Sequence, residues 1–168
     1  MRYICTAVVA TLAIAGTSFA ATINVPGDQP TIAAAISASS DGDTIAIAAG
    51  TYYEHSLNTG GKAITIGSAN GNLDVTIDAN GGGNVFKFIS GEDDGTVIKD
   101  LVITGGQTSG DSGGGIWCYY SNPTISGCTI SGNTAVESDG GGIYCWDNSS
   151  TTIITRYLSS YCIWFTGF

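Results

Sequence analysis

The sequence is poor in positive charge. Among its 168 residues, 5 Lys and Arg stand against 14 Asp and Glu, which gives a formal net charge of −9. A nucleic-acid-binding protein needs a basic surface to neutralise phosphates, so the composition excludes that class. It also disfavours a polyanionic substrate, because few cations are present to bind one. A charged content of 11% and a hydrophobic content of 43% are too apolar for a disordered chain and, at this length, predict a single folded domain.

Long apolar runs are also scarce. The clearest one, from Val8 to Ala15, follows Arg2 and precedes the small-x-small segment Ser18-Phe19-Ala20. This order of features predicts a secretory signal peptide over residues 1–20, since the apolar run is too short to span a membrane. A buried N-terminal strand or helix is the alternative. We therefore expect a secreted, extracellular or cell-surface protein whose mature chain has no membrane span.

What the chain does contain is an internal repeat. Residues 113–118 (GGGIWC) recur 27 positions later as residues 140–145 (GGGIYC), and residues 97–106 align with residues 124–133 at the same offset. Within each unit the apolar residues alternate with a period of two, and Gly, Asn, Asp and Ser separate the short runs, which is typical of strands joined by turns. A repeat of strands that returns to the same face predicts a parallel β-helix with one coil per repeat.

The predicted fold class is therefore all-β, a parallel β-helix (solenoid) of about four coils. Neighbouring coils pair as parallel strands about 4.7–4.9 Å apart, so each inward side chain should stack on its equivalent one coil away. Ile116 should then lie beside Ile143. The glycine clusters are expected where the chain turns sharply, since glycine takes positive φ at little cost.

The same stacking explains the cysteines. No Cys-x-x-Cys pair occurs, so zinc and redox motifs are weakly supported. Cys118 and Cys145 hold equivalent inward positions, and Cys128 takes the place of Leu101 as a small core residue. Cys5 belongs to the signal peptide, and Cys162 lies near the C-terminus. The alternative to a stack of thiols is a Cys118–Cys145 disulfide, which export permits and one strand spacing allows.

The N-terminal half repeats less regularly. Strands are predicted over residues 44–48, 63–67, 75–78 and 85–89, each bounded by Gly, Asn or Asp. A short helix is predicted after Pro30, with Ile32 and Ile36 on one face. The end of a solenoid needs a cap, and we expect this helix, near residues 30–39, to close the first coil.

Four N-terminal segments carry a family resemblance: residues 23–26 (INVP), 31–36 (TIAAAI), 41–45 (DGDTI) and 50–54 (GTYYE). Together they resemble the opening of right-handed parallel β-helix proteins of the pectin lyase-like superfamily. The GGGI units with the intervening Ile130-Ser131-Gly132-Asn133 are similar to the repeats of polymorphic outer membrane proteins. The resemblance extends over residues 22–154 and implies the right-handed fold without specifying an activity.

The repeat pattern fails near the C-terminus. Thr152 and Ile153 begin another coil, but Arg156 stands where an inward apolar residue is expected, and the chain ends in a cluster of aromatic residues. Truncation of a longer repeat protein explains this, and so does a divergent apolar cap. The predicted organisation is a signal peptide over residues 1–20, a β-helix domain over residues 21–154 and an aberrant tail over residues 155–168.

Catalytic machinery is not evident. The acidic groups at residues 41–43 (DGD) and 92–94 (EDD) fall beside glycines, so a solvated turn competes with a glycosidase carboxylate pair as their interpretation. His55, the sole histidine, has no Ser or Asp partner placed for it by the sequence. Arg156 is the only arginine after the signal peptide and lies in the aberrant tail, which leaves a lyase-type base without a site.

Acidic residues beside the GGG turns suggest a metal. Asp111, Glu137 and Asp139 flank these turns in two successive coils, where their oxygens would suit Ca²⁺ if they share one edge. Their spacing matches no known calcium-binding loop. Calcium is the one cofactor that the sequence suggests, and no cofactor is the alternative.

The outward positions of the same repeats are aromatic. Trp117 should stack over Tyr144 and Tyr119 over Trp146, with Tyr120 alongside. A row of exposed rings could stack on sugars or anchor a protein partner. Packing beneath a loop or beneath further coils is the alternative.

These observations predict a non-enzymatic secreted or cell-surface module with a structural or adhesive role. Its expected partner is a polysaccharide or a surface protein, and the candidate ligand-binding residues are Trp117, Tyr119, Tyr144 and Trp146. The alternative is an incomplete or inactive polysaccharide-modifying enzyme, similar to pectate lyases or pectin methylesterases, that lacks its catalytic coils.

Overall fold

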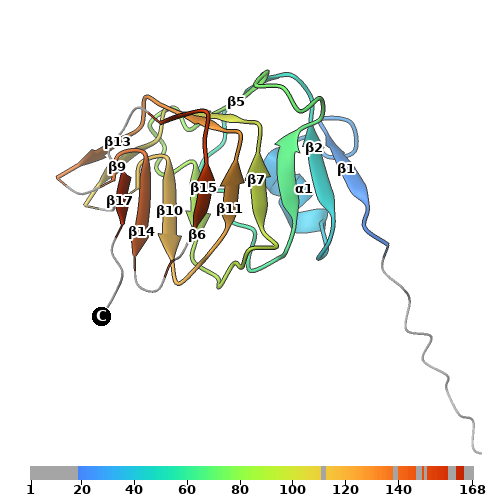
Figure 1. Cartoon of the computed structure of the whole chain (residues 1–168). Helices are drawn as coiled ribbons and strands as arrows, with labels where there is room; N and C mark the ends of the chain where they lie inside the picture. Colours follow the sequence, from blue (N-terminus) through green and yellow to red (C-terminus); the bar gives the residue numbers. More distant parts are fainter. Residues whose placement is uncertain are drawn as a thin grey trace, which may run out of the picture.

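The protein is a parallel β-solenoid of about four turns, seen in a computed structural model (Figure 1). The structure describes residues 19–110, 113–137, 140–146, 149, 151–158 and the backbone of 162–164. All sheets are parallel, and the coils lie side by side from the N-terminal end to the C-terminal end (Figure 1). The predicted all-β solenoid is therefore confirmed.

Three main sheets and one short ladder run along the solenoid axis. Sheet A contains β1 (Thr22–Val25), β2 (Thr44–Ile47), β4 (Thr65–Ser68), β7 (Val97–Lys99), β11 (Thr124–Ser126) and β15 (Thr152–Ile154). Sheet B contains β3 (Gly50–Tyr52), β5 (Val75–Asp78), β8 (Val102–Thr104), β12 (Thr129–Ile130) and β16 (Tyr157–Leu158). Sheet C contains β6 (Phe86–Phe88), β10 (Ile116–Tyr119), β14 (Ile143–Trp146) and β17 (Cys162–Trp164), and the short sheet D pairs β9 (Gln107–Ser109) with β13 (Thr134–Val136).

Inward side chains stack on their equivalents, as the repeat predicted. Ile116 of β10 pairs in parallel with Ile143 of β14, and both are fully buried. Sheet A has an inward row of its own, which contains isoleucines with 0% exposure in four successive coils: Ile45, Ile66, Ile98 and Ile125. Because each β-branched residue packs on an identical shape one strand away, one row of side chains builds a continuous core.

The glycine clusters need glycine for two different reasons. The first glycine of each cluster, Gly113 or Gly140, has a φ of about +70°, the left-handed region that the sequence predicted for a sharp turn. Gly114 and Gly115 are not in that region. A Cβ on them would lie 2.7 and 2.5 Å from the carbonyl oxygens of the next coil, so these glycines serve the close approach of two backbones.

Helix α1 (Ile32–Ala38) packs within the first coil, between β1 and β2 in the chain (Figure 1). It buries Ile32, Ala35 and Ile36. The carboxylate of Glu54 accepts hydrogen bonds from the N–H groups of Ile32 and Ala33 at one end, and the Lys62 ammonium donates to the Ile36 carbonyl at the other. The helix dipole favours a negative charge at the N-terminus and a positive charge at the C-terminus, so both contacts are stabilising. Because Glu54 and Lys62 follow the helix in the chain, these contacts fix the helix against the segments that come after it.

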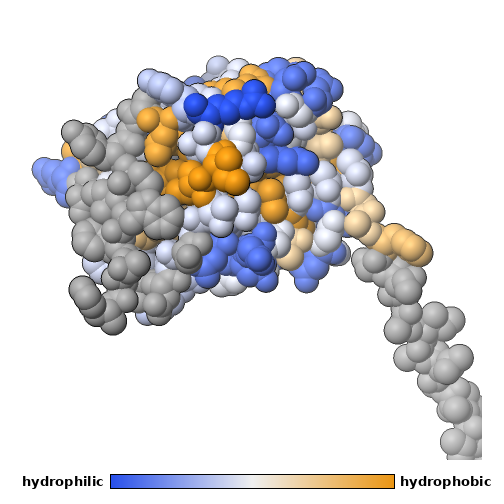
Figure 2. Space-filling view, viewed as in Figure 1, coloured by the Kyte–Doolittle hydropathy of each residue, from blue (hydrophilic) through white to orange (hydrophobic). Residues whose placement is uncertain are grey.

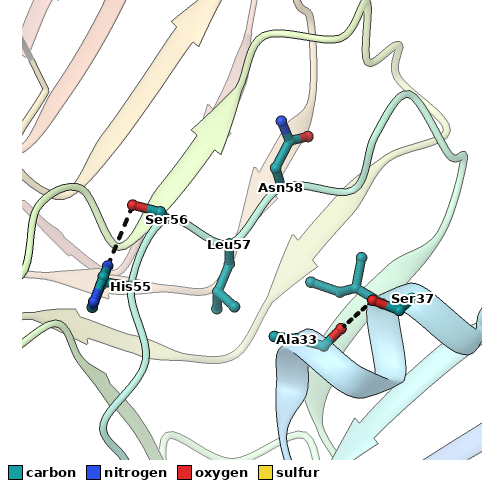
Figure 3. Close-up of a pocket in the computed structure, with 7 residues that line it drawn as sticks. Ala33, Ser37, His55, Ser56, Leu57 and Asn58 are labelled. Carbon is teal, nitrogen blue, oxygen red and sulfur yellow. Dashed lines mark hydrogen bonds between the residues drawn. The ribbon is translucent and has the colours of Figure 1, made fainter.

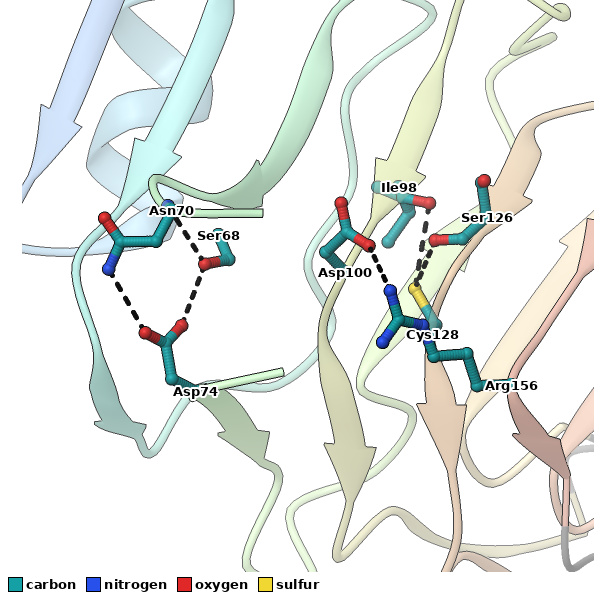
Figure 4. A network of polar contacts seen from close by, with 8 residues as sticks. All are labelled: Ser68, Asn70, Asp74, Ile98, Asp100, Ser126, Cys128 and Arg156. Carbon is teal, nitrogen blue, oxygen red and sulfur yellow. Dashed lines mark hydrogen bonds and ion pairs between the residues drawn. The ribbon is translucent and has the colours of Figure 1, made fainter. Parts of the chain in front are cut away.

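Strand pairing continues beyond residue 154. The N–H of Arg156 donates to the Cys128 carbonyl, which is the register that the repeat predicted for this position. Its side chain points outward, however, with 61% exposure, and its guanidinium lies 3.9 Å from the carboxylate of Asp100 (Figure 4). Leu101 and Cys128, one and two coils earlier, are fully buried. The long arginine side chain thus avoids burial at a position where the other coils place core residues.

Exposed aliphatic surface accompanies this last coil. The strongest hydrophobic colour in Figure 2 gathers near the middle of the molecule, where Figure 1 draws β15 and β11. Ile154, at the end of β15, is 64% exposed.

Candidate functional site

Aromatic residues gather on the outer face of sheet C. In β10 and β14, Trp117 pairs with Tyr144 and Tyr119 with Trp146, as the repeat predicted. The residues that alternate with them are fully buried, so the pleat directs the aromatic side chains away from the core. We call these four residues, together with Tyr120, the aromatic cluster.

The rings of the aromatic cluster contact one another along each strand. The ring centres of Trp117 and Tyr119 are 6.3 Å apart, and those of Tyr144 and Trp146 are 5.8 Å apart. Tyr120 meets Tyr119 edge-on at 4.6 Å. Tyr119, Tyr120 and Trp146 are all exposed, with Tyr120 the most open at 51%. The cluster therefore offers broad apolar ring faces together with phenol and indole groups, which suits a ligand that has both apolar and hydroxyl-bearing surface.

Tyr144 differs from the other predicted ligand-binding residues. Its side chain is only 5% exposed, so the expectation of an exposed ring at this position is wrong. Strand β17 pairs with β14 and extends sheet C by one strand beyond Tyr144. Tyr144 therefore supports the ring of Trp146 and lies too deep to form a main contact surface itself.

Lys87 extends the cluster by one coil toward the N-terminus. It is the register partner of Trp117, and its ammonium lies 4.7 Å from the centre of the Trp117 ring, within cation–π range. Ile89 follows in the same segment and is 41% exposed. Lys87 is not among the ligand-binding residues predicted from the sequence, although an alignment of β6 with β10 places it beside Trp117.

A groove with a volume of about 390 Å³ adjoins Lys87. Apart from Lys87, its walls include Ser56, Asn84, Gln107 and Ser109 and the glycine turn formed by residues 81–83. Within the described part of the chain, each residue that lines it is polar or a glycine. We call this hollow the polar groove. Hydroxyl and amide groups of this kind can exchange hydrogen bonds with the hydroxyls of a ligand.

A smaller pocket of about 180 Å³ lies between α1 and residues 55–58 (Figure 3). His55 Nδ1 lies 3.4 Å from Ser56 Oγ, and the His55 ring lies so close to Gly82 that a Cβ there would clash with it. Among the described residues, no carboxylate bonds to the His55 ring. The pair thus lacks, among the described residues, the acid that orients histidine in a catalytic triad, and His55 itself is exposed.

Glu92 is a buried carboxylate that joins three coils. It is 1% exposed, and it accepts hydrogen bonds from Thr59 Oγ1, the Gly61 N–H, the Ser90 N–H and Ser121 Oγ. Burial by itself would raise the pKa of Glu92, but the hydrogen bonds outweigh it and hold the pKa below the ordinary value of 4.5. This role could not be predicted from the sequence, in which Glu92 resembles part of a solvated acidic loop.

The other acidic groups considered as catalytic candidates hold turns. Asp43 accepts hydrogen bonds from the N–H groups of Ala21 and Ser40, which lower its pKa. Asp41 accepts from the Ala63 N–H, and Asp93 from the Gly95 N–H. The turn interpretation therefore accounts for these carboxylates.

A further carboxylate has the same structural function. Asp74 accepts hydrogen bonds from Ser68 Oγ and from the side-chain amide of Asn70, and these bonds lower its pKa (Figure 4). Figure 4 also shows the thiol of Cys128 directed at backbone carbonyls. Polar groups at this corner of the solenoid are thus paired with one another or with the backbone.

The predicted calcium site falls largely outside the described residues. Asp111 and Asp139 are not among them, and Glu137 has a φ of +59° and an exposed side chain. Within the part of the chain that the structure describes, no three His, Cys, Asp or Glu side chains are grouped to hold a metal ion. Calcium binding by these three residues stays a prediction.

Cys118, Cys128 and Cys145 are buried free thiols. Cys118 and Cys145 are direct register partners, which is the predicted stack. Burial raises the pKa of the Cys118 thiol, and it raises the pKa of Cys128 to about 11. Cys118 and Cys128 are therefore protonated at neutral pH and are poor nucleophiles, and all three buried thiols pack as core residues.

No helix in the described part of the chain is long and apolar enough to cross a membrane.

Comparisons with protein-family models, with curated proteins and with solved structures found no match for this chain.

Proposed function

We propose that this chain is a secreted or cell-surface β-solenoid module that binds glycan and carries out no chemistry on it. The observation that carries the proposal is the aromatic cluster on the outer face of sheet C. The exposed rings of Tyr119, Tyr120 and Trp146, with the partly exposed ring of Trp117 beside them, present the apolar faces on which sugar rings stack, together with polar atoms for their hydroxyls.

The position of the cluster supports a binding role over a purely structural one. The inward rows already form the core, so the fold does not need large aromatic residues on the outside of the sheet. Tyr120, at 51% exposure, and Trp146, at 45%, leave much of their area in contact with water. Exposed aromatic surface of this kind marks binding sites more often than it stabilises a monomer.

A non-enzymatic role agrees with the state of the titratable groups. Asp41, Asp43 and Asp93 accept hydrogen bonds from backbone amides, and Glu92 accepts hydrogen bonds from groups of three coils. The N-terminal segments that resemble the pectin lyase-like superfamily, and the repeats similar to those of polymorphic outer membrane proteins, place the chain in our proposal among exported surface proteins. The predicted signal peptide over residues 1–20 gives the route of export.

The test is a glycan array probed with the purified chain and with the Trp117→Ala, Trp146→Ala double variant. We expect the wild type to bind a subset of glycans and the double variant to lose that binding. The matched control is Tyr157→Ala, which removes an exposed aromatic ring from sheet B (58% exposed) and should bind as the wild type does. Unchanged binding in the double variant contradicts the proposal, and so does a wild type that binds no glycan.

Whether the chain has catalytic activity on the glycans that it binds is tested on the same samples. The resemblance of the opening to that of polysaccharide-modifying enzymes favours it as the second candidate. An incomplete enzyme would still bind substrate, whereas an intact one would also release new reducing ends or unsaturated products from the glycans that it binds. We expect neither product over a long incubation, and their appearance would replace the binding-module proposal.

A further inference from the structure

The polar groove and the aromatic cluster meet at a single residue. Lys87 lines the groove and at the same time holds its ammonium over the ring of Trp117. The groove therefore begins where the row of rings ends. A ligand that stacks on Trp117 and extends past Lys87 enters the groove without leaving the surface of the protein.

The direction of this combined surface follows from the register. Lys87, Trp117 and Tyr144 form one row across β6, β10 and β14, perpendicular to the strands. Such a row runs along the solenoid axis and advances about 4.8 Å with each coil. The groove is lined by residues of three coils, from Ser56 to β9, and borders the row at Lys87. A ligand that covers the groove, Trp117 and Trp146 must therefore be longer than one sugar ring, and it crosses from one outward row to the next because Trp146 pairs with Tyr119.

The groups of the groove indicate which kind of sugar fits. Gln107 and Ser109 lie on β9 with exposed side chains, and Ser56 contributes a hydroxyl. Among the described residues that line the groove, none is a carboxylate, and the cation of Lys87 is already engaged by the Trp117 ring. The whole chain carries a net charge of −9, which repels a polyanion over a distance of about 8–10 Å at physiological salt. Neutral donors and acceptors beside aromatic rings suit a chain of uncharged sugars.

We propose that the polar groove is a further sugar subsite and that the ligand is a neutral glycan chain that runs from the groove across Trp117 to Trp146. This inference rests on the proposed glycan-binding function and adds the class of ligand, its direction and the residues of the second subsite. Gln107 and Ser109 bind hydroxyls in the groove, and Lys87 sets the junction.

The test measures affinity against chain length by calorimetric titration. The probes are neutral hexose oligomers from the disaccharide to the hexasaccharide, drawn from the glycans that bind on the array, and an oligogalacturonate as the acidic probe. With the wild type, affinity should rise with length until both subsites are filled. The Gln107→Ala, Ser109→Ala groove variant should keep its affinity for the disaccharide and lose about tenfold for the hexasaccharide, the loss expected for two hydrogen-bonding side chains. Thr51→Ala, on the exposed part of sheet B, serves as the control.

Each outcome decides one question. If Trp117→Ala, Trp146→Ala abolishes binding but the groove variant keeps the full length dependence, the second subsite is wrong and the proposed function stands. If the acidic probe binds more tightly than the neutral ones and its affinity falls steeply with added salt, the neutral ligand class is wrong. If no oligomer binds the wild type, the proposed function and this inference fail together.

Discussion

Sheets A and C are built by the same coils, but their outer faces differ. On sheet A the outward row contains small β-branched residues in register: Thr44, Thr65, Val97, Thr124 and Thr152. On sheet C the outward row contains Lys87, Trp117 and Tyr144. The inward rows of both sheets are fully buried in the central coils, and Ile23 and Ile153 at the two ends of sheet A are partly buried. Coil stacking therefore constrains the inward rows, while the outward rows vary, and the residues specific to function are expected among the outward rows that depart from small side chains.

We expect the largest effect from a substitution in an inward row. Ile98→Ala removes one member of the fully buried isoleucine row of sheet A. It should lower the free energy of unfolding by about 2–5 kcal/mol, because the neighbouring isoleucines cannot fill the cavity. Urea denaturation followed by circular dichroism measures the loss. Val97→Ala, the outward neighbour on the same strand, is the control, and an equal loss in both variants would contradict the division into inward and outward rows.

The next effect concerns the polar contact that joins coils on the side of sheet C. Glu92→Gln keeps the shape of the side chain but cannot accept all of the hydrogen bonds that the carboxylate accepts. We expect a loss of about 1–3 kcal/mol in the free energy of unfolding, since buried donors are left without partners. Asp93→Asn, in the adjacent exposed turn, is the matched control. A Glu92→Gln variant as stable as the wild type would show that this carboxylate does not hold the coils together.

The same carboxylate gives a pH dependence. The folded pKa of Glu92 lies below its ordinary value, so its contribution to stability is present above about pH 4.5 and is lost as pH falls through the folded pKa. Asp43 and Asp74 shift in the same direction. Thermal unfolding from pH 7 to pH 3 should therefore show a falling midpoint below about pH 4.5, with a shallower fall in Glu92→Gln. Identical profiles for the two proteins would contradict the assignment.

We expect the smallest effect at the N-terminal end of the solenoid, where Lys62 contacts α1. Lys62→Met removes the ammonium that donates to the Ile36 carbonyl of α1 and keeps the apolar stem. The loss should be about 0.3–1 kcal/mol, which is typical of a charge at a helix terminus. Lys99→Met, on sheet A, is the control. Hydrogen exchange should show faster opening confined to α1, whereas a change spread over sheet C would contradict a local capping role.

The sequence was sufficient to predict the coils, because the 27-residue repeat and its period of two reappear as the register of Ile116 with Ile143 and of Trp117 with Tyr144. It could not predict contacts between unequal segments. Glu92 binds groups from three coils that have no common motif, and the polar groove joins Ser56 to Gln107 and Ser109 across a stretch where the repeat is irregular. The burial of Tyr144 agrees with the alternative of packing by a further coil, but the sequence did not indicate which ring is buried, since the neighbouring strand β17 lies where the repeat pattern fails.

The most direct measurement of the central claim is nuclear magnetic resonance of the ¹⁵N-labelled protein titrated with a neutral oligosaccharide from the array. If the glycan binds across sheet C and the polar groove, we expect shifts of the indole N–H signals of Trp117 and Trp146 and of the Gln107 side-chain amide. The backbone amides of sheet A should be unchanged. Shifts centred on sheet A, or indole signals that do not move while the sugar binds, would contradict the claim that the outer face of sheet C is the binding surface.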